Sequence, residues 1–369
     1  MRRPRLVHPS RRALLGGLFA SAGTLVGCGP TATVPLAPAR RWRLPAEWEP
    51  HERCVMVFPT AQNWAGCWDG RCDWLDLARA EWAAVANAVA AFEPVLLFAN
   101  EGEGALARAL VSADIEVVEV PVNDAWARDI GPLVQVDDLG GRRVAGVRFN
   151  SWGEKFSPYD DDAAFAARVA DRFDLRYLTH DLVLEGGAIS VDGEGTLLTT
   201  ERCLLNTNRN PGMSKADVEA ALNDALGITT VIWLEEGVVP DPITDGHVDG
   251  IAVFVAPGVV MMHTSDDPSA PNYAICASAR ERLLAATDAA GRALEIIELP
   301  LGPNVTHVNF YLPNGGVLVP LEGDAAVDDV ALGILRDAFP DREVVGLTGT
   351  VMAEGGGGVH CITMQVPLA

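Results

Sequence analysis

The chain has 369 residues, 49% of them hydrophobic, which is enough for a sizeable core in one large domain or two average ones. The formal net charge of -22 argues against nucleic acid as a partner, because a phosphate backbone is bound by clustered lysine and arginine. A cationic or neutral ligand suits such a chain better.

The N-terminus has the pattern of an export signal. Paired Arg11 and Arg12 precede an apolar run that is too short to span a bilayer comfortably, and small residues lead to Cys28. The string LVGC is similar to a lipobox, whose cysteine is lipidated, and SRRALL is similar to a twin-arginine motif. We therefore expect a signal peptide at 1–27 and a tether at 28–43. The mature chain would be an exported periplasmic or cell-envelope lipoprotein, whose only membrane contact is a lipid anchor at Cys28.

The seven cysteines are scattered along the chain. No Cys-x-x-Cys pair or Cys/His cluster has the spacing of a zinc site, so no metal site is expected. Cys67 and Cys72 are close enough in sequence to form a disulfide after export, and a reduced pair is an equal alternative. Cys54, Cys203 and Cys276 lie in apolar runs and are expected to be small buried hydrophobic residues.

A unit of two strands, a helix and a further strand recurs along the chain. Apolar residues at helical spacing mark the segments 72–92, 162–173, 214–226, 278–291 and 325–339. A short apolar strand follows each helix. Hairpin-like pairs of strands with glycine or Asn-Gly turns precede four of the helices, at 131–150, 188–200, 250–264 and 308–321. Ser214 is expected to cap the helix at 214–226.

The first and last units are each incomplete. Only one strand precedes the first helix, and the strand at 361–367 has no helix after it. If the C-terminal strand completes the first unit, the units close into a ring, as circular β architectures do to remove open edges. The sequence therefore predicts an α/β fold of pseudo-symmetric units, with Cys361 on the closing strand. His360 is not expected to be the partner of Cys361, since adjacent side chains on a strand point to opposite faces.

Polar residues occur at nearly regular intervals just before the hairpins and the closing strand. They are Asp129, Glu185, His247 with Asp249, Asn309 and Cys361. Equivalent positions of a ring converge on its axis, so these residues would build one pocket with a thiol, an imidazole and carboxylates. The polar stretch 204–211 is expected to be a loop without a catalytic role.

Such a pocket suits chemistry at a guanidinium group. A thiolate is a strong nucleophile, and a nearby imidazolium both lowers the thiol pKa and can donate a proton to a leaving group. Two carboxylates can hold a planar cation by forked hydrogen bonds. The glycine run before Cys361 would permit a tight turn and a close approach of substrate. Taken singly, each residue also has a plain structural interpretation, such as a turn or a salt bridge, and the regular spacing favours the functional one.

Six segments resemble the agmatine deiminase family, which shares its domain with bacterial peptidylarginine deiminases. They read LPAEWEPHERCVMVFP, NDAWARDIGP, EGGAISVDGEGTLLTTERCLLNTNRNP, TDGHVDGIAVFV, NFYLPNGGVLVP and GGGGVHCITMQVP. The resemblance runs from about Leu44 to the C-terminus. It implies a single deiminase domain at 44–369 with the five-bladed α/β propeller, or pentein fold, of guanidine-modifying enzymes.

The resemblance also implies roles for individual residues. Cys361 resembles the nucleophile and His247 the general acid and base. Asp129 and Asp249 resemble the carboxylates that hold the guanidinium group. Glu185 resembles the carboxylate that contacts substrate and helps to position the histidine. No metal or organic cofactor is implied.

The substrate is expected to be a small guanidinium compound or an arginine peptide. Trp126 resembles an aromatic residue that packs on the aliphatic stem of the substrate, and Asn309 is expected to contact substrate as well. The chain departs from many family members at Gly358 and Gly250, where they carry asparagine. These departures leave the choice between agmatine and peptidyl arginine open.

The expected function is hydrolysis of agmatine to N-carbamoylputrescine and ammonia, a step of polyamine metabolism, through an amidino-thioether on Cys361. One alternative is deimination of peptidyl arginine, which is protein citrullination. The other is a non-catalytic periplasmic binding protein for polyamine or arginine-like cations. Such a protein would also be acidic and exported, but it would not need a nucleophilic thiol.

Overall fold

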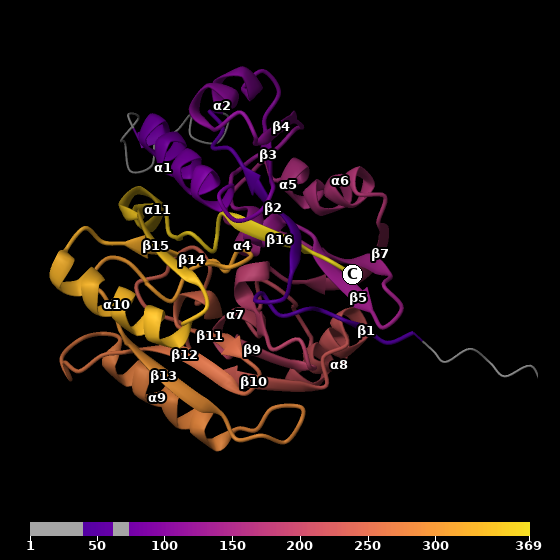
Figure 1. The fold of residues 1–369 in the computed structure, drawn as a ribbon. Helices are drawn as coiled ribbons and strands as arrows, with labels where there is room; N and C mark the ends of the chain where they lie inside the picture. Colours follow the sequence, from indigo (N-terminus) through magenta and orange to yellow (C-terminus); the bar gives the residue numbers. More distant parts are fainter. Residues whose placement is uncertain (1–39, 62–73) are drawn as a thin grey trace, which may run out of the picture. The chain divides into compact units, whose positions relative to one another are not determined.

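Five small β-sheets carry the fold in a computed structural model that describes residues 40–61 and 74–369 (Figure 1). In spatial order, the first sheet has the strands β1 (Trp42–Arg43), β5 (Leu133–Asp137), β6 (Arg142–Arg148) and β7 (Arg176–Val183), and the second has β10 (Thr230–Leu234), β9 (Thr196–Thr200) and β8 (Ser190–Val191). The third has β11 (Ala252–Ala256), β12 (Val259–Thr264) and β13 (Glu295–Pro300), and the fourth has β14 (Gly316–Leu321) and β15 (Glu343–Thr348). The fifth has β16 (Thr363–Pro367), β2 (His51–Val57), β3 (Val95–Ala99) and β4 (Glu116–Glu119).

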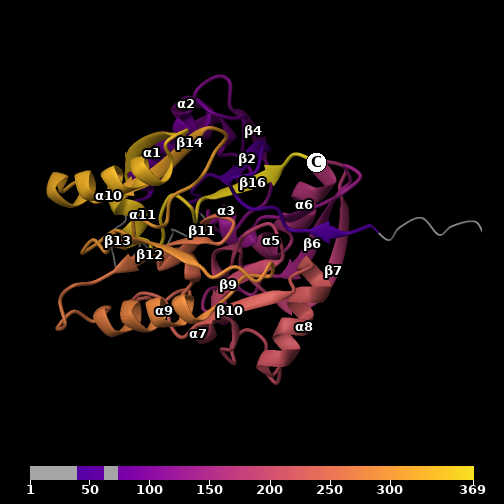
Figure 2. The same cartoon turned by 60° about the horizontal axis from the view of Figure 1, so that its bottom comes forward.

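Helices connect the strands and lie mostly outside them, as the positions of α1, α8, α9 and α10 in Figures 1 and 2 show. The α-helices are α1 (Trp74–Val89), α2 (Gly104–Leu110), α3 (Ala127–Ile130), α4 (Ser151–Glu154), α5 (Asp160–Ala163), α6 (Phe165–Arg172), α7 (Glu201–Leu204), α8 (Lys215–Leu226), α9 (Tyr273–Ala285), α10 (Ala325–Ala338) and α11 (Thr350–Glu354). The part of the chain that the structure describes also has two short 3-10 helices, η2 (Gly186–Ala188) and η3 (Val248–Gly250).

The predicted unit of hairpin, helix and strand recurs in the sheets. β5 and β6 are antiparallel, and β7 returns parallel to β6 after the helices α5 and α6. The strands β8 to β10 around α8, and β11 to β13 around α9, repeat this order. In the next unit the hairpin is reduced to one antiparallel bridge between Tyr311 and Leu318, while β14 and β15 are parallel. A helix accompanies each parallel pair because parallel neighbours need a crossover connection.

The C-terminal strand completes the first unit, as the sequence predicts. β16 pairs antiparallel with β2, with Thr363 opposite Met56, and β2 pairs parallel with β3. Figure 1 shows the yellow β16 beside the indigo β2. The prediction that Cys361 lies on this strand is wrong, since β16 begins at Thr363 and Cys361 belongs to the turn before it. The alternation of side chains along a strand therefore does not apply to His360 and Cys361.

The helix α8 illustrates how local sequence sets the ends of an element. Ser214 caps it as predicted: its hydroxyl accepts from the backbone N–H of Asp217, whose carboxylate accepts from the N–H of Ser214. Gly227 ends the helix in the left-handed conformation at φ +77°. Val218 and Leu222 are fully buried on the inner face of the helix.

The hydrophobic core holds the site in place through two tryptophans. Trp82 of α1 is 1% exposed, and its ring meets Trp126 edge to face with the centroids 5.3 Å apart. Such aromatic pairs contribute about 0.5–1.5 kcal/mol beyond the burial of their area. The Trp82 indole also donates a hydrogen bond to the carbonyl of Ala125 at 3.3 Å. The backbone beside Trp126 is thereby tied to α1.

The residues from Arg40 to Ala369 form one compact unit. The predicted leader, with Cys28, and the pair Cys67 and Cys72 lie outside the described residues. Within the described part of the chain, the helices are all too short or too polar to cross a membrane.

Candidate active site

The segments that the sequence singles out meet at one place. Asp129 lies in the short helix α3, Glu185 directly before η2, and the loop around η3 carries His247 and Asp249. Asn309 and Cys361 come from the turns before β14 and β16. All six residues are buried, since none of them is more than 9% exposed.

Gly187 marks the point where three of these side chains converge. A β-carbon on this glycine would lie 2.6 Å from Nδ1 of His247 and 2.9 Å from a carboxylate oxygen of both Asp129 and Asp249. An imidazole and two carboxylates therefore pack directly against the backbone of Gly187. A glycine is needed here because any side chain would collide with these groups.

The thiol of Cys361 lies beside the same carboxylates. Its Sγ is 3.6 Å from Oδ2 of Asp249 and 3.4 Å from Oδ1 of Asn309. Burial and the negative charges of Asp249 and Asp129 raise the pKa of the Cys361 thiol well above its usual range. A cation placed between these carboxylates would oppose both charges and favour the thiolate.

His247 lies between two further carboxylates. Its Nδ1 is 3.8 Å from Oδ1 of Asp129, and its Nε2 is 3.9 Å from Oε2 of Glu185. Burial alone would lower the pKa of His247, but the charge of Asp129 in particular raises it well above the usual range. The protonated form, which can donate a proton to a leaving group, is thus favoured.

An unusual turn holds Asp129 in position. Four successive residues from Ser151 to Glu154 have φ between +53° and +94°, and three of them are not glycine. Each such non-glycine residue costs on the order of 1–3 kcal/mol unless its surroundings hold it there. The turn aims the indole of Trp152, which donates to Oδ2 of Asp129 at 2.8 Å, while the N–H of Gly187 donates to Oδ1 at 2.9 Å.

The polar stretch 204–211, expected to be a plain loop, contains an essential partner of the site. Arg209 has a fully buried side chain and donates from Nε to Oε1 of Glu185 at 2.5 Å. Its other nitrogens donate to Asp245 at 2.9 Å and to the carbonyl of Thr244 at 3.0 Å. Arg209 therefore connects Glu185 to the loop that carries His247. The sequence offered no signal for this contact beyond a lone arginine among turn-forming residues.

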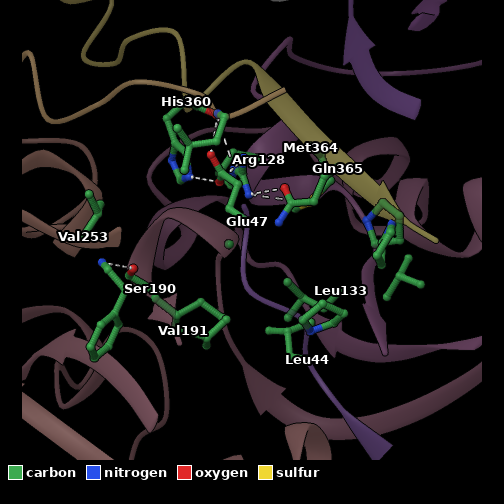
Figure 3. A pocket seen from close by; sticks show the side chains of 18 of the residues that line it. Leu44, Glu47, Arg128, Leu133, Ser190, Val191, Val253, His360, Met364 and Gln365 are labelled. Atoms are coloured by element: carbon green, nitrogen blue, oxygen red, sulfur yellow. Dashed lines mark hydrogen bonds and ion pairs between the residues drawn. The ribbon is translucent and has the colours of Figure 1, made fainter. Parts of the chain in front are cut away.

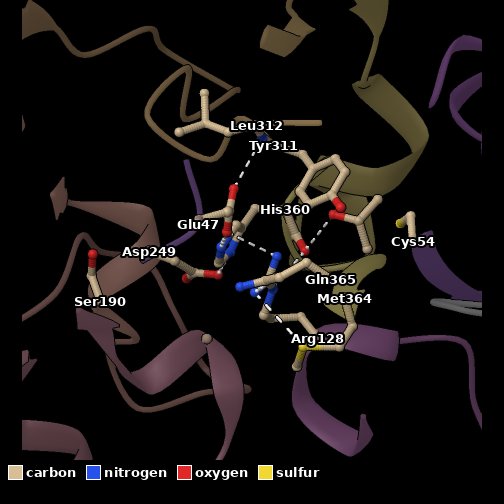
Figure 4. Close-up of polar contacts among 12 residues, drawn as sticks. Glu47, Cys54, Arg128, Ser190, Asp249, Tyr311, Leu312, His360, Met364 and Gln365 are labelled. Atoms are coloured by element: carbon tan, nitrogen blue, oxygen red, sulfur yellow. Dashed lines mark hydrogen bonds and ion pairs between the residues drawn. The ribbon is translucent and has the colours of Figure 1, made fainter. Parts of the chain in front are cut away.

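A chain of buried charges lies behind Asp249 (Figure 4). His360 Nδ1 is 2.8 Å from Asp249 Oδ2, and His360 Nε2 is 2.9 Å from Glu47 Oε2. Arg128 donates to the same oxygen of Glu47 at 3.0 Å and to the amide oxygen of Gln365 at 2.8 Å. His360 is thus not a hydrogen-bond partner of Cys361, but both side chains contact the same carboxylate.

The pocket drawn in Figure 3 is lined by side chains of this chain of charges and is separate from the thiol. It has a volume of about 60 Å³, and its lining includes Arg128, Glu47 and His360 but neither Cys361 nor His247. Pockets for organic ligands are typically about 300–1,000 Å³, so this space is suited to a few water molecules instead. The apolar side chains Leu44, Leu133 and Val191 complete its wall.

Glycines close the turn over the thiol. A β-carbon on Gly357 would lie 2.4 Å from the ring of Trp126 and 3.1 Å from Cβ of Cys361, so Trp126 packs directly over the turn. A β-carbon on Gly358 would lie 2.5 Å from Oδ1 of Asn309. The departure from the family pattern at Gly358 therefore fits the position that the Asn309 side chain occupies here.

This chain is similar to known proteins over almost its whole length. The family model described as Porphyromonas-type peptidyl-arginine deiminase matches residues 43–367. The chain belongs to this family. The matched range includes every site residue named above, from Glu47 to Gln365.

Individual agmatine deiminases are similar to this chain along nearly their full length. The agmatine deiminase of Stutzerimonas stutzeri is 41% identical over 358 residues, covering 88% of this chain and 95% of its own. That of Pseudomonas aeruginosa is 41% identical over 360 residues, with the same coverage. The solved agmatine deiminase of Enterococcus faecalis superposes with a TM-score of 0.83 at 34% identity, covering 89% of this chain and 96% of that one. The chain thus has the α/β fold of these deiminases.

Proposed function

We propose that this protein hydrolyses agmatine to N-carbamoylputrescine and ammonia. The observation that carries the proposal is the convergence of Cys361, His247, Asp129 and Asp249 beside the backbone of Gly187. Relatives of this chain at 41% identity are agmatine deiminases. A binding protein for cations would have no use for the thiol, so a catalytic role accounts for more of the site.

The reaction follows from the arrangement of these groups. A guanidinium group held between Asp129 and Asp249 brings its positive charge to the thiol and favours the Cys361 thiolate. Sγ attacks the guanidinium carbon, the C–N bond breaks, and ammonia leaves with a proton from His247. Neutral His247 then takes a proton from water, whose oxygen bonds to the carbon of the amidino-thioether. Breaking of the C–S bond restores the thiolate and releases the ureido product, while the remaining hydroxyl proton passes to solvent.

Glu185 and Trp126 complete the proposed site. Glu185, anchored by Arg209, faces Nε2 of His247 and stabilises its protonated form. Trp126 covers the thiol and would pack against the aliphatic stem of the substrate. Asn309 touches Cys361, so we assign it to positioning the thiol within the substrate site.

The charges around the site favour agmatine over free arginine and over peptides that end in arginine. Both of these carry an α-carboxylate that agmatine lacks, and a carboxylate would need a free cationic partner. Arg128, Arg209 and Lys155, which lie around this site, are each paired with a carboxylate of the protein. Agmatine brings no carboxylate and needs no such partner.

We also propose a pseudo-symmetric five-bladed propeller for residues 44–369, with one sheet per blade and the pairing of β16 with β2 as its closure. The five repeats of one strand order support this arrangement.

For residues 1–27 and 28–43 we propose a signal peptide and a tether, with lipidation at Cys28 and location in the periplasm or cell envelope. Labelling of the expressed protein with a fatty acid, lost in Cys28→Ala, would test the anchor.

The test of the function is product formation by the purified protein, offered agmatine, free arginine and an arginine peptide in parallel. We expect ammonia and the ureido product from agmatine, and no turnover by Cys361→Ser at an unchanged melting temperature. Preference for the peptide would make the protein a peptidylarginine deiminase. Turnover by Cys361→Ser near the wild-type rate would refute the assignment of the nucleophile.

A further inference from the structure

We propose that Glu185, Cys203 and His247 form a binding site for a divalent transition-metal ion, most suitably Zn²⁺, on the Nε2 side of His247, opposite the Nδ1 atom that faces Gly187. Among the described residues, these three bring one ligand atom each to within 4.8 Å of one another. Thiolate, imidazole and carboxylate are the ligands that zinc takes in proteins. Inhibition of catalysis by the bound ion rests on the proposed deiminase function, whereas binding itself does not.

Two of the three ligand atoms lack a hydrogen-bond partner. Oε2 of Glu185 and Nε2 of His247 are buried, 3.9 Å apart, and neither has a partner within hydrogen-bonding distance. The residues themselves are 0% and 5% exposed. Leaving a buried polar atom without a partner is unfavourable, so a ligand that satisfies both atoms would be favoured. Both atoms lie within 4.8 Å of the sulfur of Cys203.

The distances suit a tetrahedral ion after a small movement. Zinc bonds of about 2.0–2.3 Å place the ligand atoms of a tetrahedron roughly 3.3–3.6 Å apart. The present separations of 3.9 Å and at most 4.8 Å therefore require inward shifts on the order of 1 Å by side-chain rotation. A water molecule would complete the fourth position.

Each ligand is also held by a second residue, as is typical of metal sites. Nδ1 of His247 faces Asp129, which matches the carboxylate that orients many zinc-bound histidines. Oε1 of Glu185 is held by Arg209, which leaves Oε2 for the ion. The third ligand, Cys203, is held through its backbone N–H, which donates to the hydroxyl of Thr200.

Thr200 sets the distance between Cys203 and His247. Its hydroxyl donates to the carbonyl of Gly246 at 2.5 Å and accepts from the N–H of Cys203 at 3.3 Å. The turn of α7 that carries the thiol is therefore tied directly to the residue before His247. Cys203 has no part in the proposed reaction. As a metal ligand, this buried thiol would have a function in addition to packing in the core.

A bound ion would stop the proposed reaction without touching the nucleophile. The metal replaces the protons of the Cys203 thiol and of Nε2 of His247, which pass to solvent. With zinc on Nε2, His247 cannot become an imidazolium, so it cannot donate a proton to ammonia and then recover it from water. The ion would therefore act as a reversible inhibitor that the substrate does not displace directly.

The test is a titration of the metal-free full-length protein with Co²⁺, read as the thiolate-to-cobalt absorption band in the near ultraviolet. We expect a band at one ion per chain in the wild type and in Cys361→Ser. Cys203→Ser should lose it and bind Zn²⁺ at least tenfold more weakly. Cys276→Ser, which alters another buried thiol, is the matched control and should behave as the wild type. A band that is lost in Cys361→Ser but kept in Cys203→Ser, or that is equal in all variants, would overturn the proposal.

X-ray absorption and inhibition assays test the same site in independent ways. If Cys203→Ser does not fold, zinc X-ray absorption of the loaded wild type and Cys361→Ser should each show one sulfur at about 2.3 Å. Absence of sulfur in loaded Cys361→Ser would contradict the site. In agmatine assays, Zn²⁺ should inhibit the wild type reversibly, and Cys203→Ser should need at least tenfold more Zn²⁺. A metal-free wild type without activity would refute the deiminase function and leave the cobalt result standing.

Discussion

Nδ1 of His360 lies 2.8 Å from the oxygen of Asp249 that also faces the thiol of Cys361. Nε2 of the same ring lies 2.9 Å from Glu47. A histidine donates from both nitrogens only when it is protonated. Burial and Arg128 lower the pKa of His360, but Glu47 and Asp249 raise it above its usual value. His360 therefore acts as a buried cation that orients the substrate-holding carboxylate.

Glu47 should contribute to stability in a pH-dependent way. Burial raises its pKa, but His360 and Arg128 lower it further, to about 2 from 4.5. Because the folded pKa lies below the unfolded one, the stabilisation is present above pH 4.5 and is lost as the pH falls toward 2. Glu47→Gln should therefore lower the free energy of unfolding at pH 7 by about 3 kcal/mol.

Urea denaturation at several pH values would check this prediction. The difference between wild type and Glu47→Gln should shrink progressively below pH 4.5. Glu298→Gln is the control, because Glu298 forms an exposed pair with Arg280 whose loss should cost less than about 1 kcal/mol. A difference for Glu47→Gln that is constant with pH would contradict the pairing.

The charge of Asp249 should control the reactivity of the nucleophile. Asp249→Asn removes a negative charge beside Sγ and one of the two carboxylates that pair with the His360 cation, so the pKa of the free Cys361 thiol should fall. Deimination should fall by about a hundredfold or more, because the guanidinium loses one of its carboxylates. The measurement is the pH profile of iodoacetamide labelling of the Cys361 peptide, followed by mass spectrometry. A thiol pKa that rises in the variant would show that Asp249 does not oppose the thiolate.

Removal of β16 should abolish folding of the domain. This strand pairs with β2 along its length, and its Thr363, Met364 and Val366 are at most 2% exposed. A chain ending at residue 362 should lose the cooperative thermal transition, since the lost burial and pairing approach the about 5–15 kcal/mol that stabilises a typical domain. Removal of only Leu368 and Ala369, which are exposed, should leave the transition nearly unchanged. Equal melting temperatures for both truncations would contradict the role of β16 in completing the first sheet.

Alanine substitutions at two glycines should have different effects: Gly357→Ala should lower activity, and Gly333→Ala should raise stability. In Gly357→Ala the new methyl group would displace Trp126 or the turn of Cys361, and a shift of about 1 Å can cost a hundredfold in kcat/KM. Gly333→Ala lies in α10 with open space around it, so it should stabilise the protein by about 1 kcal/mol with unchanged activity. Agmatine kinetics and thermal melting of both variants measure these effects. Full activity of Gly357→Ala would mean that Trp126 can move without consequence.

The elements of the fold were accessible from the sequence because local rules define them. Apolar periodicity and turn residues indicated the strands and the longer helices from 131 to 348, and Ser214 was recognised as a cap. The small elements β1, α2, β4, α4 and α7 were not predicted, because such short segments carry little periodicity. The start of the last strand was misjudged as well, since β16 begins at Thr363 and Cys361 stands in the turn before it.

The sequence by itself determined the repeating order of strands and helices, and it indicated the thiol, imidazole and carboxylates, since polar residues recur at equivalent places in each unit. Only the tertiary structure decided their partners: Arg209 for Glu185, Trp152 for Asp129, and His360 for Asp249. These partners lie 23 to 111 residues apart in sequence. Their pairing depends on burial, where low polarity makes an unpaired charge costly, and burial is a property of the folded chain rather than of any local pattern.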